Sequence, residues 1–206
     1  MERKLKIGGV DMNDILKDIL KDIELETTED DELIDFTPPF TIRKVCDWKH
    51  IQKLSKVGLK EYLLNQRVLR KESVIYNTHL NTEKDFIILY GDAHDPYFIV
   101  ASIISPDNAY NYVSIAAMES GNNSLYISDI NVKEIETNKG YGSLLLNQLK
   151  ANALQYNKNR ITGTLTSADL TDHGNRLVHF YRKHDFEVEL FGSIGKVVWN
   201  INSSTD

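Results

Sequence analysis

The stretch from Leu125 to Leu146 constrains the fold more than any other part of the sequence. Residues 125–132 (LYISDINV) are rich in the apolar and β-branched residues of a strand. Residues 141–156 repeat leucine and alanine with the period of a helix. Between them the chain crosses two glycines, Gly140 and Gly142. Because glycine adopts backbone angles that other residues avoid, this turn permits a close approach of the backbone to a ligand.

The start of this helix has the features of an anion site. The first N–H groups of a helix have no partner inside it, and the helix dipole is positive there. Lys139 adds a cation at the tip of the turn. Two common phosphate motifs do not fit, because no Gly-Lys-Ser/Thr follows at the Walker spacing and the three-glycine dinucleotide pattern is incomplete. Taken alone, the turn is equally compatible with a plain tight turn.

The strand before the turn changes its apolar face near its end. Apolar residues occupy one face up to Ile127 and the other face from Ile130 to Val132. Such a switch predicts a bulge or a splay, which would expose main-chain groups to an extended ligand. Asp129 lies at this irregularity, where it either stabilises a turn or takes part in catalysis.

Strands and helices alternate along the chain from Phe40 onward. Helices are expected at 47–69 (capped by Asp47), 141–156 and 175–183, and strands at 40–45, 86–90, 97–104, 110–118, 125–132, 161–165, 186–191 and 197–201. Residues 70–83 show no clear pattern. Turn signals between the strands from 86 to 132 favour antiparallel pairing. The sequence therefore predicts an α+β fold, in which helices flank one mixed, mostly antiparallel sheet.

Residues 1–39 are expected to form an acidic arm, separate from a domain at 40–206. Residues 11–35 contain eleven acidic residues and two lysines, so the remainder of the chain is nearly neutral although the net charge is -6. Apolar residues at helical spacing predict an amphipathic helix over 11–25. Its apolar stripe would pack on its own domain, on a second copy of the chain in a homodimer, or on another protein.

Composition narrows the classes of function. A near-neutral body gives no electrostatic reason to bind nucleic acid. No stretch approaches the roughly 18 apolar residues of a membrane span, and the N-terminus leads to no apolar segment of a secretory signal. Cys46 is the single cysteine, so no disulfide within the chain is expected. The histidines are scattered along the sequence and do not predict a metal site. These features favour a cytoplasmic protein.

The glycine turn and a later stretch together carry a family resemblance. The first reads Asn138-Lys-Gly140-Tyr-Gly142-Ser, and the second reads Asn175-Arg-Leu-Val-His-Phe-Tyr181-Arg-Lys-His-Asp-Phe186. In this order they resemble the acetyl-CoA loop (Arg/Gln-x-x-Gly-x-Gly/Ala) and the later motif (Asn-x-x-x-x-Phe-Tyr-x-x-x-Gly-Phe) of the GNAT superfamily of N-acetyltransferases. Thr137 stands at the Arg/Gln position and Asp185 at the last glycine. The resemblance covers roughly residues 40–201.

The resemblance implies transfer of an acetyl group from acetyl-CoA to a primary amine by direct attack. The pantetheine arm would pair with the backbone of Ile130 and Val132, and Asn175 would contact the same arm. Tyr181 would return a proton to the leaving thiolate, and Asp129 would steer the amine or pass its proton to water. The pyrophosphate would bind the loop residues Asn138, Lys139, Gly140, Tyr141, Gly142 and Ser143.

Two other functions stay open at this point. A GNAT-like fold of weak activity could be an acyl-CoA-binding or regulatory module that engages a protein partner through the acidic arm. Acetylation of tRNA is disfavoured by the near-neutral body and the acidic arm. The sequence does not specify whether the acceptor amine belongs to a small molecule or to a protein.

Overall fold

The computed structural model describes residues 6–7, 10–11, 47–65, 69–107, 109–132 and 138–201. The chain divides into two compact units, Met1–Phe40 and Thr41–Asp206. In the first unit, strands β1 (Lys6–Ile7) and β2 (Val10–Asp11) pair in antiparallel orientation. Asp11 thus belongs to a strand and does not start the predicted helix. The rest of that helix, the strand at 40–45 and the predicted domain boundary at 39/40 lie outside the described residues.

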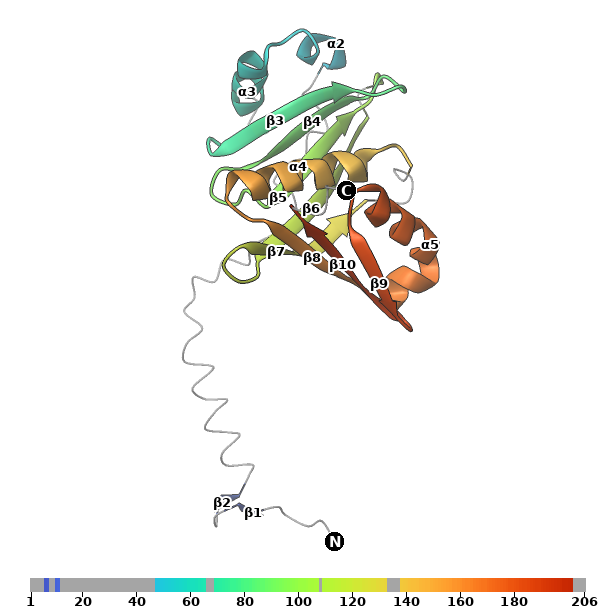
Figure 1. Ribbon diagram of the computed structural model, residues 1–206. Helices are drawn as coiled ribbons and strands as arrows, with labels where there is room; N and C mark the ends of the chain where they lie inside the picture. The colour runs from blue at the N-terminus through green and yellow to red at the C-terminus, as the bar shows by residue number, and fades with distance from the viewer. Residues whose placement is uncertain are drawn as a thin grey trace. The chain divides into compact units, whose positions relative to one another are not determined.

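The second unit contains one eight-stranded sheet (Figure 1). Its parallel pair, β7 with β8, lies inside the sheet, and every other pair of neighbouring strands in it is antiparallel. This arrangement confirms the prediction of a mixed, mostly antiparallel sheet. In spatial order the strands are β3 (Ser73–Leu80), β4 (Phe86–Asp92), β5 (Phe98–Ile104), β6 (Tyr110–Glu119), β7 (Ser124–Asn131), β8 (Arg160–Leu165), β10 (Ile194–Asn200) and β9 (Glu187–Phe191).

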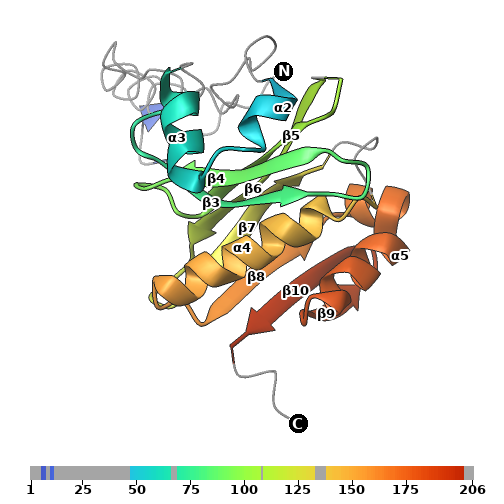
Figure 2. The same cartoon turned by 90° about the horizontal axis from the view of Figure 1, so that it is seen from above.

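Helices cover both faces of the sheet (Figure 2). On one face lies α4 (Tyr141–Gln155), which contacts β5 and β6 and in which Leu145, Leu146 and Leu149 are fully buried. The opposite side carries α2 (Trp48–Ile51) and α3 (Lys56–Asn65), the latter in contact with β3. α5 (Ser167–Lys183) packs beside β9 and β10. None of the helices in the described ranges is long and apolar enough to cross a membrane.

The segment 47–69, where one or two helices are expected, contains two short helices. The Asp47 side chain caps the first by accepting a hydrogen bond from the Lys49 amide at 2.9 Å, as predicted. The segment without a clear pattern, 70–83, contains the edge strand β3. Its polar residues and a register shift between Ile75 and Asn77 interrupt the alternation that a strand normally shows.

The helix predicted at 175–183 begins earlier, at Ser167. Thr166 and Asp169 form a capping box there: the Asp169 amide donates to the Thr166 hydroxyl, and the Thr166 amide donates to the Asp169 carboxylate. The polar residues of the first turns and the central Gly174 hide this start in the sequence. The prediction of a short helix was therefore wrong by two turns.

Packing of α4 on the sheet should carry a large share of the stability. Leu149 is fully buried, whereas Leu154 on the same helix is 45% exposed. We expect Leu149→Ala to lower the free energy of unfolding by about 2–5 kcal/mol, because it leaves a cavity in the core. Urea unfolding followed by circular dichroism measures this change. Leu154→Ala is the matched control, and equal losses in the two variants would contradict the packing described.

Candidate functional site

Strands β7 and β8 pair only along the first four residues of each. The parallel register runs from Ser124 opposite Arg160 to Ile127 opposite Gly163. β7 continues to Asn131 and β8 to Leu165, beyond the last pair that joins them. On its other side β7 stays paired with β6 as far as Asn131. The two strands therefore diverge, and the edge of β7 that faces β8 is not used by this ladder after Ile127.

A β-bulge in β7 coincides with this divergence. Ile127 lies opposite Ala117 and Asp129 opposite Ala116, so Ser128 is the extra residue. The Ser128 hydroxyl donates to the Ala116 carbonyl at 3.1 Å. The bulge or splay predicted from the change of apolar face is thus confirmed. It leaves Asp129 exposed at the point where the strands part.

A pocket of about 820 Å³ lies between the diverging strands. The ends of β7 and β8, the first turn of α4 and one side of α5 line it. It brings together most of the site residues predicted from the sequence: Asp129, Ile130, Val132, Asn138, Gly140, Tyr141, Gly142, Ser143 and Tyr181.

Two predicted site residues are placed differently. The ammonium group of Lys139 forms an ion pair with the Glu83 carboxylate at 3.2 Å, and Lys139 is not among the residues that line the pocket. Asn175 occupies an exposed position on α5, next to the lining residue Arg176. Thr137, at the Arg/Gln position of the resemblance, lies outside the described residues.

The first turn of α4 meets the pocket without a side-chain cap. Gly140 is the N-cap residue and has the left-handed φ of 84°, after Asn138 with φ of 64°. Within the helix, the Leu144 amide donates back to the Gly140 carbonyl at 3.2 Å. The preceding N–H groups of a helix have no partner inside it, which makes such an end suited to an anion.

The close packing of α4 on α5 explains the second glycine. A Cβ atom at Gly142 would lie 3.3 Å from the Phe180 ring, closer than most side-chain contacts. The hydroxyl of the next residue, Ser143, lies 2.8 Å from Nε2 of His184, which follows α5 directly. The C-terminal end of α5 is therefore fixed beside the first turn of α4.

A row of basic side chains on α5 faces the same pocket. Arg176, His179 and Lys183 are three and four residues apart, so they share one side of the helix, and all three line the pocket. None of the three is among the site residues predicted from the sequence. Their helical spacing inside the helix already expected at 175–183 was the available signal.

Tyr181 lines the pocket from a buried position, with 6% of its surface exposed. Burial, followed by the nearby charge of Asp169, raises the pKa of the Tyr181 hydroxyl far above its ordinary value. Edge-on contacts with Phe180 and Phe186, at 5.3 and 5.4 Å between ring centroids, hold the ring in place. The phenol is therefore protonated at neutral pH and can donate a proton or a hydrogen bond.

His184 joins the two helices in its uncharged form. Burial lowers its pKa, and the positive charges of Lys150 and Lys183 lower it further, against the opposing effect of Asp185. The unfolded chain therefore binds a proton at His184 more readily than the folded protein does. The stabilising contribution of neutral His184 is complete above the unfolded pKa of about 6.5 and is lost as the pH falls below it.

Lowering the pH should therefore destabilise the protein through His184. We expect the free energy of unfolding to fall between about pH 7 and pH 5, and His184→Gln to remove part of this fall. Urea unfolding at a series of pH values measures both. Substitution of the exposed His94 by Gln serves as the control. A pH dependence that is the same in wild type and His184→Gln would show that His184 has no such role.

No family model matches the sequence. One curated relative is the uncharacterized protein YocC of Bacillus subtilis, 41% identical over 51 residues, which are 25% of this chain and 30% of the relative. The match thus spans less than a third of that relative's length.

Solved structures similar to this chain include acetyltransferases. A Bacillus subtilis acetyltransferase in complex with CoA is 13% identical and matches over 50% of this chain and 77% of its own, with a TM-score of 0.37. The PaiA N-acetyltransferase of Thermoplasma acidophilum in complex with coenzyme A is 16% identical, over 49% and 59%, with a TM-score of 0.38. A GNAT-family acetyltransferase from Staphylococcus aureus is 13% identical, over 52% and 70%, with a TM-score of 0.40.

Proposed function

We propose that this protein is a GNAT-type N-acetyltransferase that binds acetyl-CoA between β7 and β8. The observation that carries the proposal is the meeting of three features in one pocket: the diverging edge of β7, the uncapped start of α4 at Gly140, and the buried Tyr181. Both sequence motifs that resemble the GNAT superfamily contribute residues to this pocket. Its volume of about 820 Å³ suits an extended small molecule.

The charges around the pocket support an acyl donor that carries phosphates. The N–H groups of Gly142 and Ser143 would bind the pyrophosphate at the positive end of α4. Arg176 and Lys183 lie along the same pocket and would add positive charge. The cation that the sequence assigned to Lys139 would thus come from α5 instead, because Lys139 is paired with Glu83.

The edge of β7 supports an extended, amide-containing arm. After Ile127 this edge has no ladder with β8, and Ile130 and Val132 line the pocket. An extended ligand can add to such an edge as a strand would. The backbone of these two residues would pair with the pantetheine arm, and Asn175 at the neighbouring surface of α5 would contact it, as the resemblance implies.

Bound acetyl-CoA would supply the activated acetyl group, and the chain would orient it against a neutral amine. The amine nitrogen would form the new C–N bond as the C–S bond breaks. Tyr181, kept protonated by burial, would donate its proton to the departing sulfur, a contribution of ~10²–10⁴-fold in rate. Asp129, exposed at the bulge, would hold the amine or pass its proton to water.

Binding of acetyl-CoA should depend on the backbone at Gly140. Alanine there has room for its Cβ but is strained at a φ of 84°. Gly192, in the turn between β9 and β10, has the same combination of open space and positive φ, and it does not line the pocket. Each alanine variant should lose about 1–2 kcal/mol of stability through left-handed strain.

Calorimetric titration separates this shared loss of stability from the effect on binding. We expect wild type and Gly192→Ala to bind acetyl-CoA equally and Gly140→Ala to bind roughly tenfold more weakly, because only the latter moves the anion-binding N–H groups. Absence of binding by the wild-type protein would refute the proposed function.

Tyr181→Phe should lower kcat by about 10²-fold or more and change the KM for acetyl-CoA little, since the hydroxyl acts in the transition state. Release of CoA thiol with a panel of amines measures both quantities. Tyr156→Phe, at an exposed tyrosine away from the pocket, is the control. Tight acetyl-CoA binding without turnover on any amine would favour the alternative of a non-catalytic binding module.

A further inference from the structure

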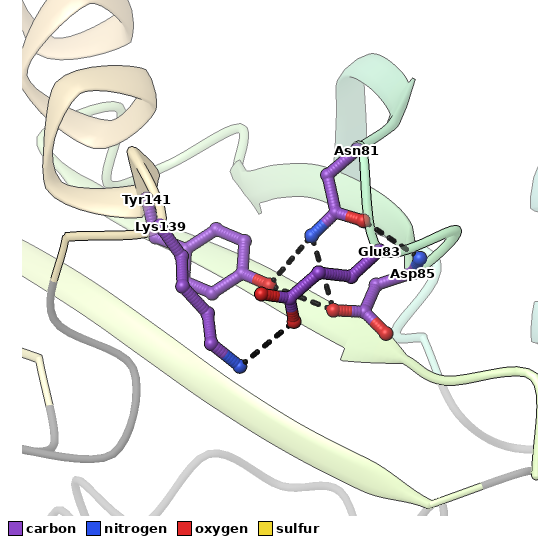
Figure 3. A network of polar contacts seen from close by, with 5 residues as sticks. All are labelled: Asn81, Glu83, Asp85, Lys139 and Tyr141. Atoms are coloured by element: carbon purple, nitrogen blue, oxygen red, sulfur yellow. Dashed lines mark hydrogen bonds and ion pairs between the residues drawn. The ribbon is translucent and has the colours of Figure 1, made fainter.

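The glycine turn is attached to a distant part of the chain. Tyr141, the first residue of α4, is fully buried, and its hydroxyl donates to Oδ2 of Asp85 at 3.0 Å. The side-chain nitrogen of Asn81, Nδ2, lies 3.0 Å from this hydroxyl and 3.0 Å from the same carboxylate oxygen. Asn81 and Asp85 flank the turn between β3 and β4, so the network joins that turn to the start of α4 (Figure 3).

The turn between β3 and β4 is itself well fixed. The Asp85 amide donates to Oδ1 of Asn81 at 2.8 Å, and the Asn81 amide donates to the Asp85 carbonyl at 3.1 Å. A third hydrogen bond runs from the Lys84 amide to the Asn81 carbonyl at 3.0 Å. The turn is therefore a rigid support for whatever it contacts.

A second contact holds the other side of Gly140. Lys139 reaches Glu83, in the same turn, at 3.2 Å (Figure 3). The Glu83 side chain is 56% exposed, so water and salt weaken this ion pair. The buried contact of Tyr141 with Asp85 is the stronger of the two.

The Asp85 carboxylate is ionised although it is buried. Burial raises its pKa, but hydrogen bonds from Ser105, Asn81 and Tyr141, with the charge of Lys139, outweigh burial and hold the pKa below its ordinary value. A hydrogen bond to an ionised acceptor is roughly twice as strong as one between neutral groups.

We propose that Asp85, acting through Tyr141, is a positioning residue of the acyl-CoA site: it sets the glycine turn in the shape that binds phosphate before the ligand arrives. The inference rests on the proposed function. A turn that has to be ordered on binding costs conformational entropy that a preformed turn does not. Loss of the contact should therefore weaken the affinity for acetyl-CoA, while the acid at Tyr181, on α5, continues to work.

Two variants test this proposal by calorimetric titration with acetyl-CoA. Tyr141→Phe removes a single oxygen and leaves Asp85 its bonds from Asn81 and Ser105, and Asp85→Asn removes the charge. We expect each to raise the Kd roughly tenfold, which corresponds to the free energy of one hydrogen bond to an ionised group. The double variant should lose little more affinity for acetyl-CoA than the single variant with the larger loss, because both changes act on the same contact. The binding stoichiometry of each variant should be unchanged.

The stoichiometry separates positioning from a purely structural role. A residue that only supports folding would reduce the fraction of binding-competent protein and leave the Kd of the remainder unaltered. The control is Glu119→Gln, which breaks the ion pair of Glu119 with Lys158, 2.8 Å long, away from the pocket; its Kd should equal that of wild type.

The titrations distinguish failure of the role proposed for Asp85 from failure of the proposed function. An unchanged Kd in Tyr141→Phe, or a reduced stoichiometry with the wild-type Kd, would overturn the role of Asp85 and leave the proposed function standing. No binding by the wild-type protein would overturn both. If Asp85→Asn does not fold, Tyr141→Phe decides alone.

Discussion

The site depends on the end of hydrogen bonding between β7 and β8. Up to Ile127 and Gly163 the two strands form an ordinary parallel ladder. Beyond this pair the bulge at Ser128 keeps β7 on β6 while β8 turns away toward the capping box that starts α5. The gap becomes a pocket because α4 and α5 close its sides, and it offers a strand edge, a helix N-terminus and a buried phenol to one ligand.

The glycine turn at the head of this pocket is held from two directions. Toward the β3–β4 turn, Tyr141 donates to the ionised carboxylate of Asp85. Toward α5, Ser143 meets the neutral His184, and Phe180 fills the space that a side chain at Gly142 would need. Gly142, between these anchors, presents only its backbone, and the anchors fix where its N–H group lies. Rigid elements on both sides thus compensate for the absence of a side-chain cap on α4.

Features that depend on local pattern could be predicted from the sequence. The mostly antiparallel sheet, the bulge near Ser128 and the start of α4 follow from alternation, helical period and glycine placement. The start of α5 was missed although Thr166 and Asp169 have the spacing of a capping box, because Gly174 and the polar first turns outweighed it. The bond from Tyr141 to Asp85 joins residues 56 positions apart and leaves no local signature. The same holds for the pairing of Lys139 with Glu83, which removes from the pocket a cation that the sequence placed there.

The claim that this pocket binds an acyl-CoA is tested most directly by titrating ¹⁵N-labelled protein with CoA and following the backbone amide resonances. We expect the largest shifts at Gly142 and Ser143, where the phosphates would bind, and at Ile130, where the pantetheine arm would pair. The amides of β3 away from the turn should change little. Shifts confined to residues outside the pocket, or no shifts at millimolar CoA, would show that this pocket does not bind CoA.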